Sequence, residues 1–207
     1  MLREHPRRLQ AGGSGNRALT FERAGAGSAA LNMMVLMRIH IATDHAGLDF
    51  STRLQHHLRE AGHEVIDHGP VQYDALDDYP AFCIRAAQAV VADQSAGVEA
   101  IGVVFGGSGN GEQIAANKVA GIRAALVWNL STAELAREHN DANVISIGAR
   151  QHSFDEVISF IDRFVATPFS GDERHVRRIG QIADFERDGS LLPDPRQEGV
   201  GSADGRA

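Results

Sequence analysis

The chain has 207 residues, of which 43% are hydrophobic, and this is enough for one domain with a sizeable core but not comfortably for two. The formal net charge of −7 argues against a nucleic-acid partner, and no apolar run is long enough to predict a membrane partner. The single cysteine, Cys83, excludes an internal disulfide and a cysteine-based zinc site, which fits a reducing, cytoplasmic setting. We expect its thiol to be buried and inert.

Residues 1–36 differ in composition from the rest of the chain. Five arginines stand among Gly, Ser and Ala residues, hydrophobic periodicity does not begin before Leu31, and the apolar core of a secretory signal is missing. We predict a disordered extension over 1–36, which an over-long start-site assignment would also explain. The main domain is expected over 37–187, and the stretch 188–207, rich in Gly, Pro and charge, is predicted to be a disordered tail.

Strand and helix patterns alternate five times in the main domain. Short apolar, β-branched runs predict strands at 38–43, 64–67, 100–105, 122–128 and 144–148. Helical patterns lie between and after them: a run with Phe50, Leu54 and Leu58 on one face that Gly62 ends, a helix from 79 to about 91, a helix that begins in the glycine-rich turn 106–111, and three helices with predicted capping boxes at 131–134, 153–156 and 170–173.

This alternation predicts an α/β fold, a three-layer Rossmann-like open parallel sheet of five strands with helices on both faces. Ligands of such sheets bind beyond the carboxyl ends of the strands. Polar residues at the ends of the predicted strands are therefore expected to meet at one edge of the sheet. They are Asp44 and His45 after the first strand, the glycine-rich turn after the third, Asn129 after the fourth and Arg150 after the fifth.

The sequence Gly-Gly-Ser-Gly-Asn-Gly at 106–111, with Glu112 directly after it, is the strongest functional signal. Four glycines let a ligand approach the backbone closely, and the free N–H groups of such a turn point at negative charge. Ser108 adds a hydroxyl and Glu112 a potential base, which indicates catalysis as well as binding. The alternatives are a turn that serves packing alone and a glutamate that complements the helix dipole. Dinucleotide and P-loop fingerprints fit the sequence badly.

Basic residues further along the chain form a possible phosphate clamp. Arg174 and Arg178 lie at i and i+4 on a predicted helix and so share a face, and Arg150 would join them from a strand end. A solvated basic helix face is the alternative interpretation. His139 and Asn140 end another predicted helix, where the helix dipole favours a cationic imidazole. The histidines lack His-Glu-x-x-His spacing, so no metal site is expected.

Five separated motifs, at 44–47, 106–112, 114–118, 137–140 and 174–178, occur in an order that resembles type B ribose-5-phosphate isomerase. This is a sugar-phosphate isomerase family that also contains the galactose-6-phosphate isomerase subunits. The resemblance covers about 37–186 and neither tail. In the more familiar branch of the family a cysteine, the proposed base, stands at the position of Gly106. This chain resembles instead the actinobacterial-type branch, in which a glutamate at the position of Glu112 removes the proton.

The resemblance implies interconversion of ribose 5-phosphate and ribulose 5-phosphate, with no metal and no organic cofactor. One base that moves a proton between C2 and C1 through a cis-enediolate is sufficient, and Glu112 is the candidate. Ser108 and the N–H groups of the turn would stabilise the enediolate oxygen. By family analogy His139 opens the sugar ring. The other substrate contacts that the resemblance implies are Asp44, His45, Tyr79 and Asn140, then Gly107, Gly109, Asn110 and Gly111 in the turn, and Arg150, Arg174 and Arg178 at the phosphate.

In the family the site is shared between the subunits of a homodimer, sometimes a dimer of dimers, so we expect at least a dimer. The pKa of Glu112 is subject to opposed effects, because a helix N-terminus lowers it and burial raises it. Two alternative functions stay open. One is an isomerase of a six-carbon sugar phosphate, such as allose or galactose 6-phosphate. The other is a nucleotide- or phosphate-binding α/β module that has lost the chemistry.

Overall fold

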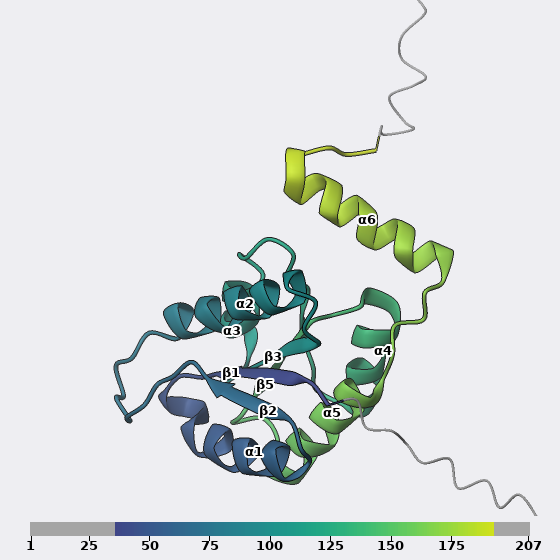
Figure 1. The fold of residues 1–207 in the computed structure, drawn as a ribbon. Coiled ribbons are helices and arrows are strands. Elements are labelled where there is room, and N and C mark those ends of the chain that lie inside the picture. The colour runs from purple at the N-terminus through teal and green to yellow at the C-terminus, as the bar shows by residue number, and fades with distance from the viewer. Residues whose placement is uncertain (1–35, 193–207) are drawn as a thin grey trace, which may run out of the picture. The chain divides into compact units, whose positions relative to one another are not determined.

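The computed structural model describes residues 36–192, so the predicted N-terminal extension and most of the predicted tail lie outside the described residues. Within these residues five parallel strands form one sheet in the order β2-β1-β3-β5-β4 (Figure 1). The strands are β1 Arg38–Ala42, β2 Glu64–Asp67, β3 Ala100–Gly106, β4 Ala124–Leu126 and β5 Val144–Gly148. The predicted five-stranded, all-parallel α/β sheet is confirmed.

Helices cover both faces of the sheet. They are the short 3-10 helix η1 His45–Gly47 and the α-helices α1 Leu48–Glu60, α2 Tyr79–Ser95, α3 Asn110–Ala116, α4 Leu130–Asn140, α5 Phe154–Ala166 and α6 Glu173–Asp188. Buried side chains of α1, α4 and α5 share one core cluster with β1, β3 and β5. Those of α2 and α3 share the other, on the opposite face (Figure 1). Two apolar cores on one parallel sheet explain why β3 is buried along its whole length.

The strand order places a topological switch between β1 and β3. These two strands are neighbours, but the chain leaves β1 through α1 on one face and returns to β3 through α2 on the other. The segments that extend beyond the two strands therefore diverge at the carboxyl edge of the sheet, which is where ligands of such folds bind. Asp44 lies after β1 at this edge and Gly107 lies after β3.

The helix ends agree with the sequence in two cases and differ in two. Gly62 has φ of 92° just after α1, and Ser153 caps α5 through a capping box with Glu156, so both predictions are confirmed.

The predicted box at 131–134 is wrong, because Asn129 is the N-cap of α4 and accepts the Thr132 N–H at 2.8 Å. The box at 170–173 is also wrong. Asp172 is the N-cap of α6, and the Ser170 hydroxyl lies 2.8 Å from His175 Nδ1 instead.

The fourth strand is shorter than the predicted 122–128. β4 lies at the end of the sheet and pairs with β5 alone. Just before it, the Arg123 N–H donates to the side-chain oxygen of Asn143 at 2.8 Å rather than to a strand backbone. A side chain therefore ends the ladder where the apolar pattern of the sequence would continue it.

Cys83 lies on α2 and is completely buried. Burial raises the pKa of its thiol to about 12, and the nearby charges of Glu112 and Asp44 act in the same direction. The predicted burial of Cys83 is confirmed, and a thiol with this pKa is a poor nucleophile at neutral pH. No helix among residues 36–192 combines the length and the apolar character that a membrane crossing requires.

Leu54 tests the first core cluster. Its side chain is fully buried, so Leu54→Ala removes apolar contacts and leaves a cavity, and we expect a loss of about 2–5 kcal/mol in the free energy of unfolding. Urea denaturation measures this loss. Thr52→Ala, an exposed position on the same helix, is the control and should change the free energy by less than about 0.5 kcal/mol. Equal effects of the two substitutions would contradict the assigned packing of α1.

Candidate active site

The glycine-rich turn lies on one side of the switch point. Gly109 has φ of 79°, and a Cβ atom there would lie 2.8 Å from Leu126 Cδ1 and 2.9 Å from the carbonyl carbon of Ile147, so both its conformation and its surroundings require glycine. The buried Ser146 hydroxyl donates to the Gly109 carbonyl at 2.7 Å and fixes the turn on β5. Within the described part of the chain, the N–H groups of Gly107, Ser108 and Gly109 have no hydrogen-bond partner. They are available to an anionic oxygen.

Glu112 points from the first turn of α3 into the interior and is only 4% exposed. Its carboxylate lies against the Cα of Gly106, in the space that a side chain at position 106 would fill. Burial raises the pKa of Glu112. Its own backbone N–H opposes this by donating to the carboxylate, whereas the negative charge of Asp44 adds to the rise. The net shift of the Glu112 pKa, whose direction the sequence does not determine, is therefore upward, as expected for a carboxylate that has lost most of its contact with water.

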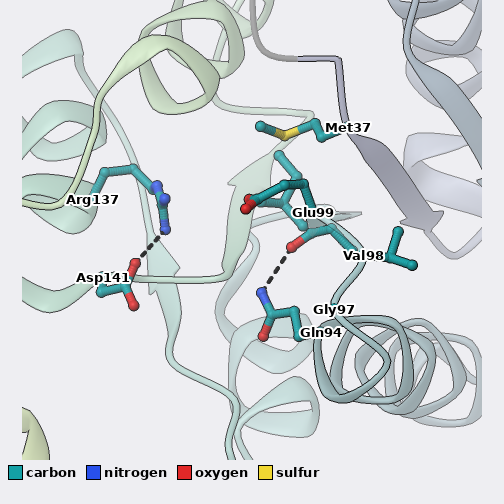
Figure 2. A pocket seen from close by; sticks show the side chains of 9 residues that line it. Met37, Gln94, Gly97, Val98, Glu99, Arg137 and Asp141 are labelled. Atoms are coloured by element: carbon teal, nitrogen blue, oxygen red, sulfur yellow. Dashed lines mark hydrogen bonds and ion pairs between the residues drawn. The ribbon is translucent and has the colours of Figure 1, made fainter.

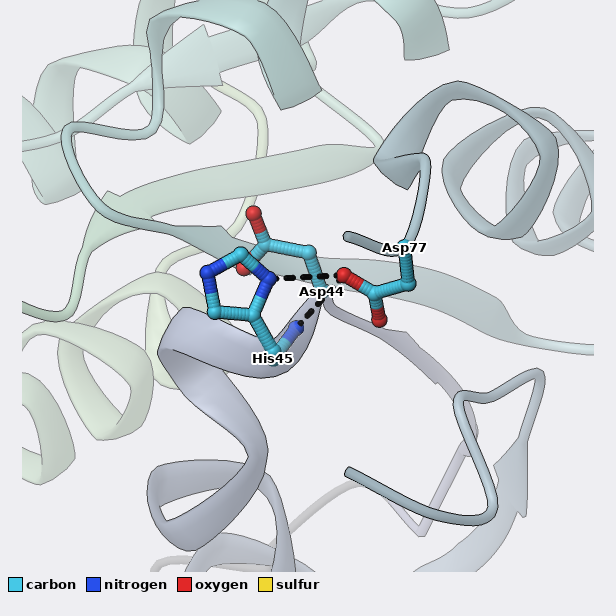
Figure 3. A group of neighbouring side chains, drawn as sticks. All are labelled: Asp44, His45 and Asp77. Atoms are coloured by element: carbon cyan, nitrogen blue, oxygen red, sulfur yellow. Dashed lines mark hydrogen bonds and ion pairs between the residues drawn. The ribbon is translucent and has the colours of Figure 1, made fainter. Parts of the chain in front are cut away.

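Asp44 and His45 lie on the other side of the switch point, after β1. The Asp44 carboxylate caps η1 by accepting the Ala46 N–H at 2.8 Å. His45 Nδ1 lies 2.7 Å from Asp77 Oδ1 (Figure 3). Each of Asp44, His45 and Asp77 offers one potential ligand atom within 4.8 Å of the others, which is a grouping that could hold a metal ion. The hydrogen bonds to Ala46 and between His45 and Asp77 also account for this arrangement within the protein itself.

Three further predicted residues lie at the glycine-rich turn. The Tyr79 ring packs on Gly111, where a Cβ atom would lie 2.5 Å from the phenol oxygen. The Arg150 guanidinium lies over Gly107, and the backbone N–H of Arg150 donates to the Gly107 carbonyl at 3.2 Å. Asn110 lies beside Ser108, since its side-chain amide donates to the Ser108 hydroxyl at 3.2 Å. The turn thus gathers a phenol, a guanidinium and a hydroxyl close to Glu112.

His139 and Asn140 lie at the opposite edge of the same sheet. α4 begins beyond the carboxyl end of β4 and ends next to the start of that strand, where Arg123 Nε donates to the Asn140 carbonyl at 2.8 Å. The His139 ring packs on the buried His175 ring of α6, with ring centroids 4.3 Å apart. One chain therefore does not bring His139 and Asn140 to Glu112.

The predicted arginine clamp is divided in the same way. Arg150 lies at the carboxyl edge, whereas Arg174 and Arg178 are exposed on α6, whose first turn contacts the end of α4. Arg174 has a long ion pair of 3.8 Å with Asp172. Asn129 lies at the carboxyl edge as expected, but its side chain is occupied in capping α4.

A cavity of about 300 Å³ also opens at the amino edge, between the turn after α2 and the end of α4 (Figure 2). Gln94 donates from its amide to the Ala100 carbonyl at 2.8 Å there, and Arg137 pairs with Asp141 at 2.9 Å. None of the residues predicted for catalysis or substrate binding lines it. The predicted base Glu112 and the glycine-rich turn lie at the other, carboxyl edge of the sheet.

Asp77 is a site residue that the sequence did not single out. It lies in the loop 68–78, whose length and polarity indicated only a connection between β2 and α2. Its side chain is 8% exposed, and its second oxygen, Oδ2, is buried without a hydrogen-bond partner in the described chain. The one signal in the sequence is the run of carboxylates at 74, 77 and 78 directly before Tyr79.

Comparison with known proteins identifies the class. A parallel α/β sheet with an amide-lined glycine turn and a buried carboxylate at its switch point defines a small-ligand enzyme of the open α/β type. The family model described as Ribose/Galactose Isomerase matches residues 39–182, and the chain belongs to this family. The ribose-5-phosphate isomerase B of Mycobacterium tuberculosis is 52% identical over 159 residues, which are 77% of this chain and 96% of that protein.

Solved structures agree with this assignment. Ribose-5-phosphate isomerase B from Mycoplasma genitalium, with bound ribulose-5-phosphate, has a TM-score of 0.70 and 39% identity, covering 73% of this chain and 97% of that one. The type B ribose 5-phosphate isomerase of Trypanosoma cruzi has a TM-score of 0.69 and 39% identity, covering 75% of this chain and 99% of that one. The described fold is therefore that of the isomerase family.

Gly106→Ala tests the packing of Glu112 on the turn. The added methyl group would overlap the Glu112 carboxylate, which must then move, so we expect isomerase activity to fall by about tenfold to a hundredfold while the protein stays folded. Steady-state kinetics and a thermal melt measure the two quantities. Gly180→Ala is the matched control, since a Cβ atom there meets nothing within 4 Å. Full activity of Gly106→Ala would contradict the position of the carboxylate.

Proposed function

We infer that the protein is an aldose–ketose isomerase that interconverts D-ribose 5-phosphate and D-ribulose 5-phosphate. The observation that carries this inference is the buried Glu112 carboxylate in the same turn as the N–H groups of Gly107, Ser108 and Gly109, which have no hydrogen-bond partner among residues 36–192. Family membership and relatives with this activity in their names support the same reaction. The reaction belongs to the interconversion of sugar phosphates in carbohydrate metabolism.

Glu112 is proposed as the base that carries the proton. It removes the proton from C2 of the open-chain aldose, which gives a cis-enediol(ate), and returns the proton to C1 to give the ketose. Burial suits this role because a carboxylate with a raised pKa holds the proton better between the two steps. The same conversion takes a proton from the O2 hydroxyl and places one on O1, so one proton moves between the two carbons and one between the two oxygens.

The turn is proposed to stabilise the oxygen that becomes negative. The N–H groups of Gly107, Ser108 and Gly109 are fixed by the turn, and the exposed Ser108 hydroxyl adds a fourth donor. Donors that are already oriented cost no reorganisation when charge develops, which is why such sites stabilise enediolates. Asp44, which follows β1 on the other side of the switch point, is proposed to hold sugar hydroxyls, and Tyr79 is proposed to pack beside them.

Ring opening and phosphate binding are proposed to need a second copy of the chain. His139, Asn140, Arg174 and Arg178 lie at the edge away from Glu112 in their own chain, so a homodimer that shares its sites would supply them across the interface. The surface of α6 supports this arrangement. Its apolar residues Val176, Ile182 and Phe185 are each at least 50% exposed, and Ile182 and Phe185 lie three residues apart on one side of the helix.

A six-carbon sugar phosphate is the second candidate substrate, because the family model includes galactose isomerases. A coupled assay that compares ribose 5-phosphate, allose 6-phosphate and galactose 6-phosphate at equal concentrations discriminates the two substrate classes. A preference for a six-carbon substrate would replace the five-carbon assignment and leave the proposed base unchanged.

Glu112→Gln tests the base. Glutamine keeps the size of the side chain but cannot accept the proton, so we expect kcat to fall about 10²–10⁴-fold with little change in the Kd for sugar phosphate. Glu60→Gln, on the exposed end of α1, is the control and should leave kcat unchanged. If the protein is a binding module instead, Glu112→Gln would leave its ligand affinity and its role unaltered.

The stability of Glu112→Gln separates lost chemistry from lost folding. Because the folded pKa of Glu112 is raised, its charged form is disfavoured in the folded protein. The contribution of Glu112 to the free energy of unfolding is therefore fully present below the ordinary glutamate pKa. It is lost as the pH rises through the raised pKa of Glu112 in the folded protein. Glu112→Gln removes this cost, so its melting temperature at neutral pH should equal or exceed that of the wild type.

Subunit mixing tests the shared site. We expect homodimers of Glu112→Gln and of His139→Ala to be nearly inactive, whereas each mixed dimer contains one site with both residues intact. Random reassociation makes half of the dimers mixed, with one intact site of two, so about a quarter of wild-type activity should return. Wild-type protein taken through the same dissociation is the control. No recovery, with a fully recovered control, would contradict the shared site.

A further inference from the structure

Asp77 holds His45 by two hydrogen bonds to one oxygen. Asp77 Oδ1 accepts from the His45 backbone N–H at 3.1 Å and lies 2.7 Å from His45 Nδ1 (Figure 3). The first contact fixes the start of η1 and the second fixes the ring. The Asp77 side chain is 8% exposed, so this pairing is shielded from water that would compete for it.

The pairing also decides which ring nitrogen faces outward. An ionised carboxylate only accepts hydrogen bonds, so His45 must carry a proton on Nδ1 to meet Asp77. Figure 3 shows Nε2 on the side of the ring away from Asp77, and Nε2 has no hydrogen-bond partner among the described residues. The side chain is 23% exposed at the carboxyl edge of the sheet, with the Tyr73 ring packed edge-on against it, so the imidazole is not sealed within the core.

We propose that Asp77 is a positioning residue, which orients His45 so that Nε2 binds an oxygen atom of the sugar phosphate. This rests on the proposed function, because it assigns the ligand of the same site. A ring with its proton on Nδ1 accepts from a sugar hydroxyl at Nε2, and a ring protonated on both nitrogens donates to a phosphate oxygen. The shared chemistry is a single directional hydrogen bond at Nε2, as in the carboxylate–histidine pairs that orient metal ligands and catalytic histidines.

A purely structural role for Asp77 is the competing explanation, since the loop 68–78 needs anchors. Asp74 serves the loop alone, because its side chain accepts the Leu76 N–H at 2.9 Å and its carbonyl accepts the Asp77 N–H at 3.1 Å. Asp74→Ala is therefore the matched control. It removes a carboxylate from the same loop without removing a contact to His45.

Kinetics on Asp77→Ala, Asp77→Asn and Asp74→Ala tests the proposal. We expect Asp77→Ala to lower kcat/KM for ribose 5-phosphate by about 10- to 100-fold, the range for partners that orient a histidine. Asparagine still offers an oxygen to Nδ1–H, so Asp77→Asn should recover most of this loss. Asp74→Ala should stay within about twofold of the wild type. Equal losses in Asp77→Ala and Asp74→Ala would overturn the proposal in favour of loop anchoring.

A double-mutant cycle with His45→Ala asks whether Asp77 acts through the ring. The backbone bond from residue 45 to Asp77 survives in His45→Ala, so an anchoring role would persist there. If Asp77 acts through the ring, Asp77→Ala should cost less than about twofold further in the His45→Ala protein. A full additional loss would overturn the proposal.

The ring itself is observed by long-range ¹H–¹⁵N NMR on the full-length protein. The wild type should show His45 protonated on Nδ1, and Asp77→Ala should lose this preference. Titration with inorganic phosphate and with ribose, as separate probes, identifies which oxygen Nε2 meets, and a response to neither overturns the proposal. The tautomer does not depend on turnover. A wild type without isomerase activity would therefore reject the proposed function, while the NMR result still judges the pairing of Asp77 with His45.

Discussion

The space above the Cα of Gly106 is the constraint on which the site depends. The Glu112 carboxylate fills it, so a side chain at 106 and a carboxylate in this position exclude each other. Burial in this space removes the carboxylate from water and raises its pKa, which gives a carboxylate the properties of a base that can hold a proton. Among residues 36–192, the N–H groups of Gly107, Ser108 and Gly109 in the same turn have no hydrogen-bond partner. The roles proposed for this turn in binding, acid–base chemistry and charge stabilisation therefore have one structural cause.

The sheet determines what can reach this carboxylate. β1 and β3 are neighbours and end at the same carboxyl edge, so the switch between them places Asp44 and His45 next to the turn. α4 runs antiparallel to β4 and has the reverse effect on His139, because it carries this residue to the amino edge. A chain of this topology cannot fold its own His139 onto Glu112. The division of polar groups between the two edges is the reason that a second copy enters the proposed mechanism.

The elements that could be predicted are those set by local patterns. The β-branched runs gave β2 and β5 their bounds, the alternation gave the parallel sheet, and Gly62 and Ser153 marked helix ends. The errors arise where a side chain from elsewhere in the chain or a nearer cap takes over, as Asn143 does at β4 and Asn129 at α4. The direction of the Glu112 pKa shift could not be predicted because it depends on how deeply the carboxylate is buried. Asp77 could not be identified because its role depends on the tertiary contact with His45. The spacing of residues in the sequence reveals neither the burial nor the contact.

The pKa of Glu112 in the free protein tests the central claim most directly. Selective ¹³C labelling of glutamate side chains, with Glu112→Gln used to assign the signal, allows the carboxyl carbon of Glu112 to be titrated by NMR. The account predicts a midpoint above the ordinary value of 4.5, because burial disfavours the charged form. A midpoint at or below 4.5 would show a carboxylate that is open to water or held by strong donors, and would contradict the account.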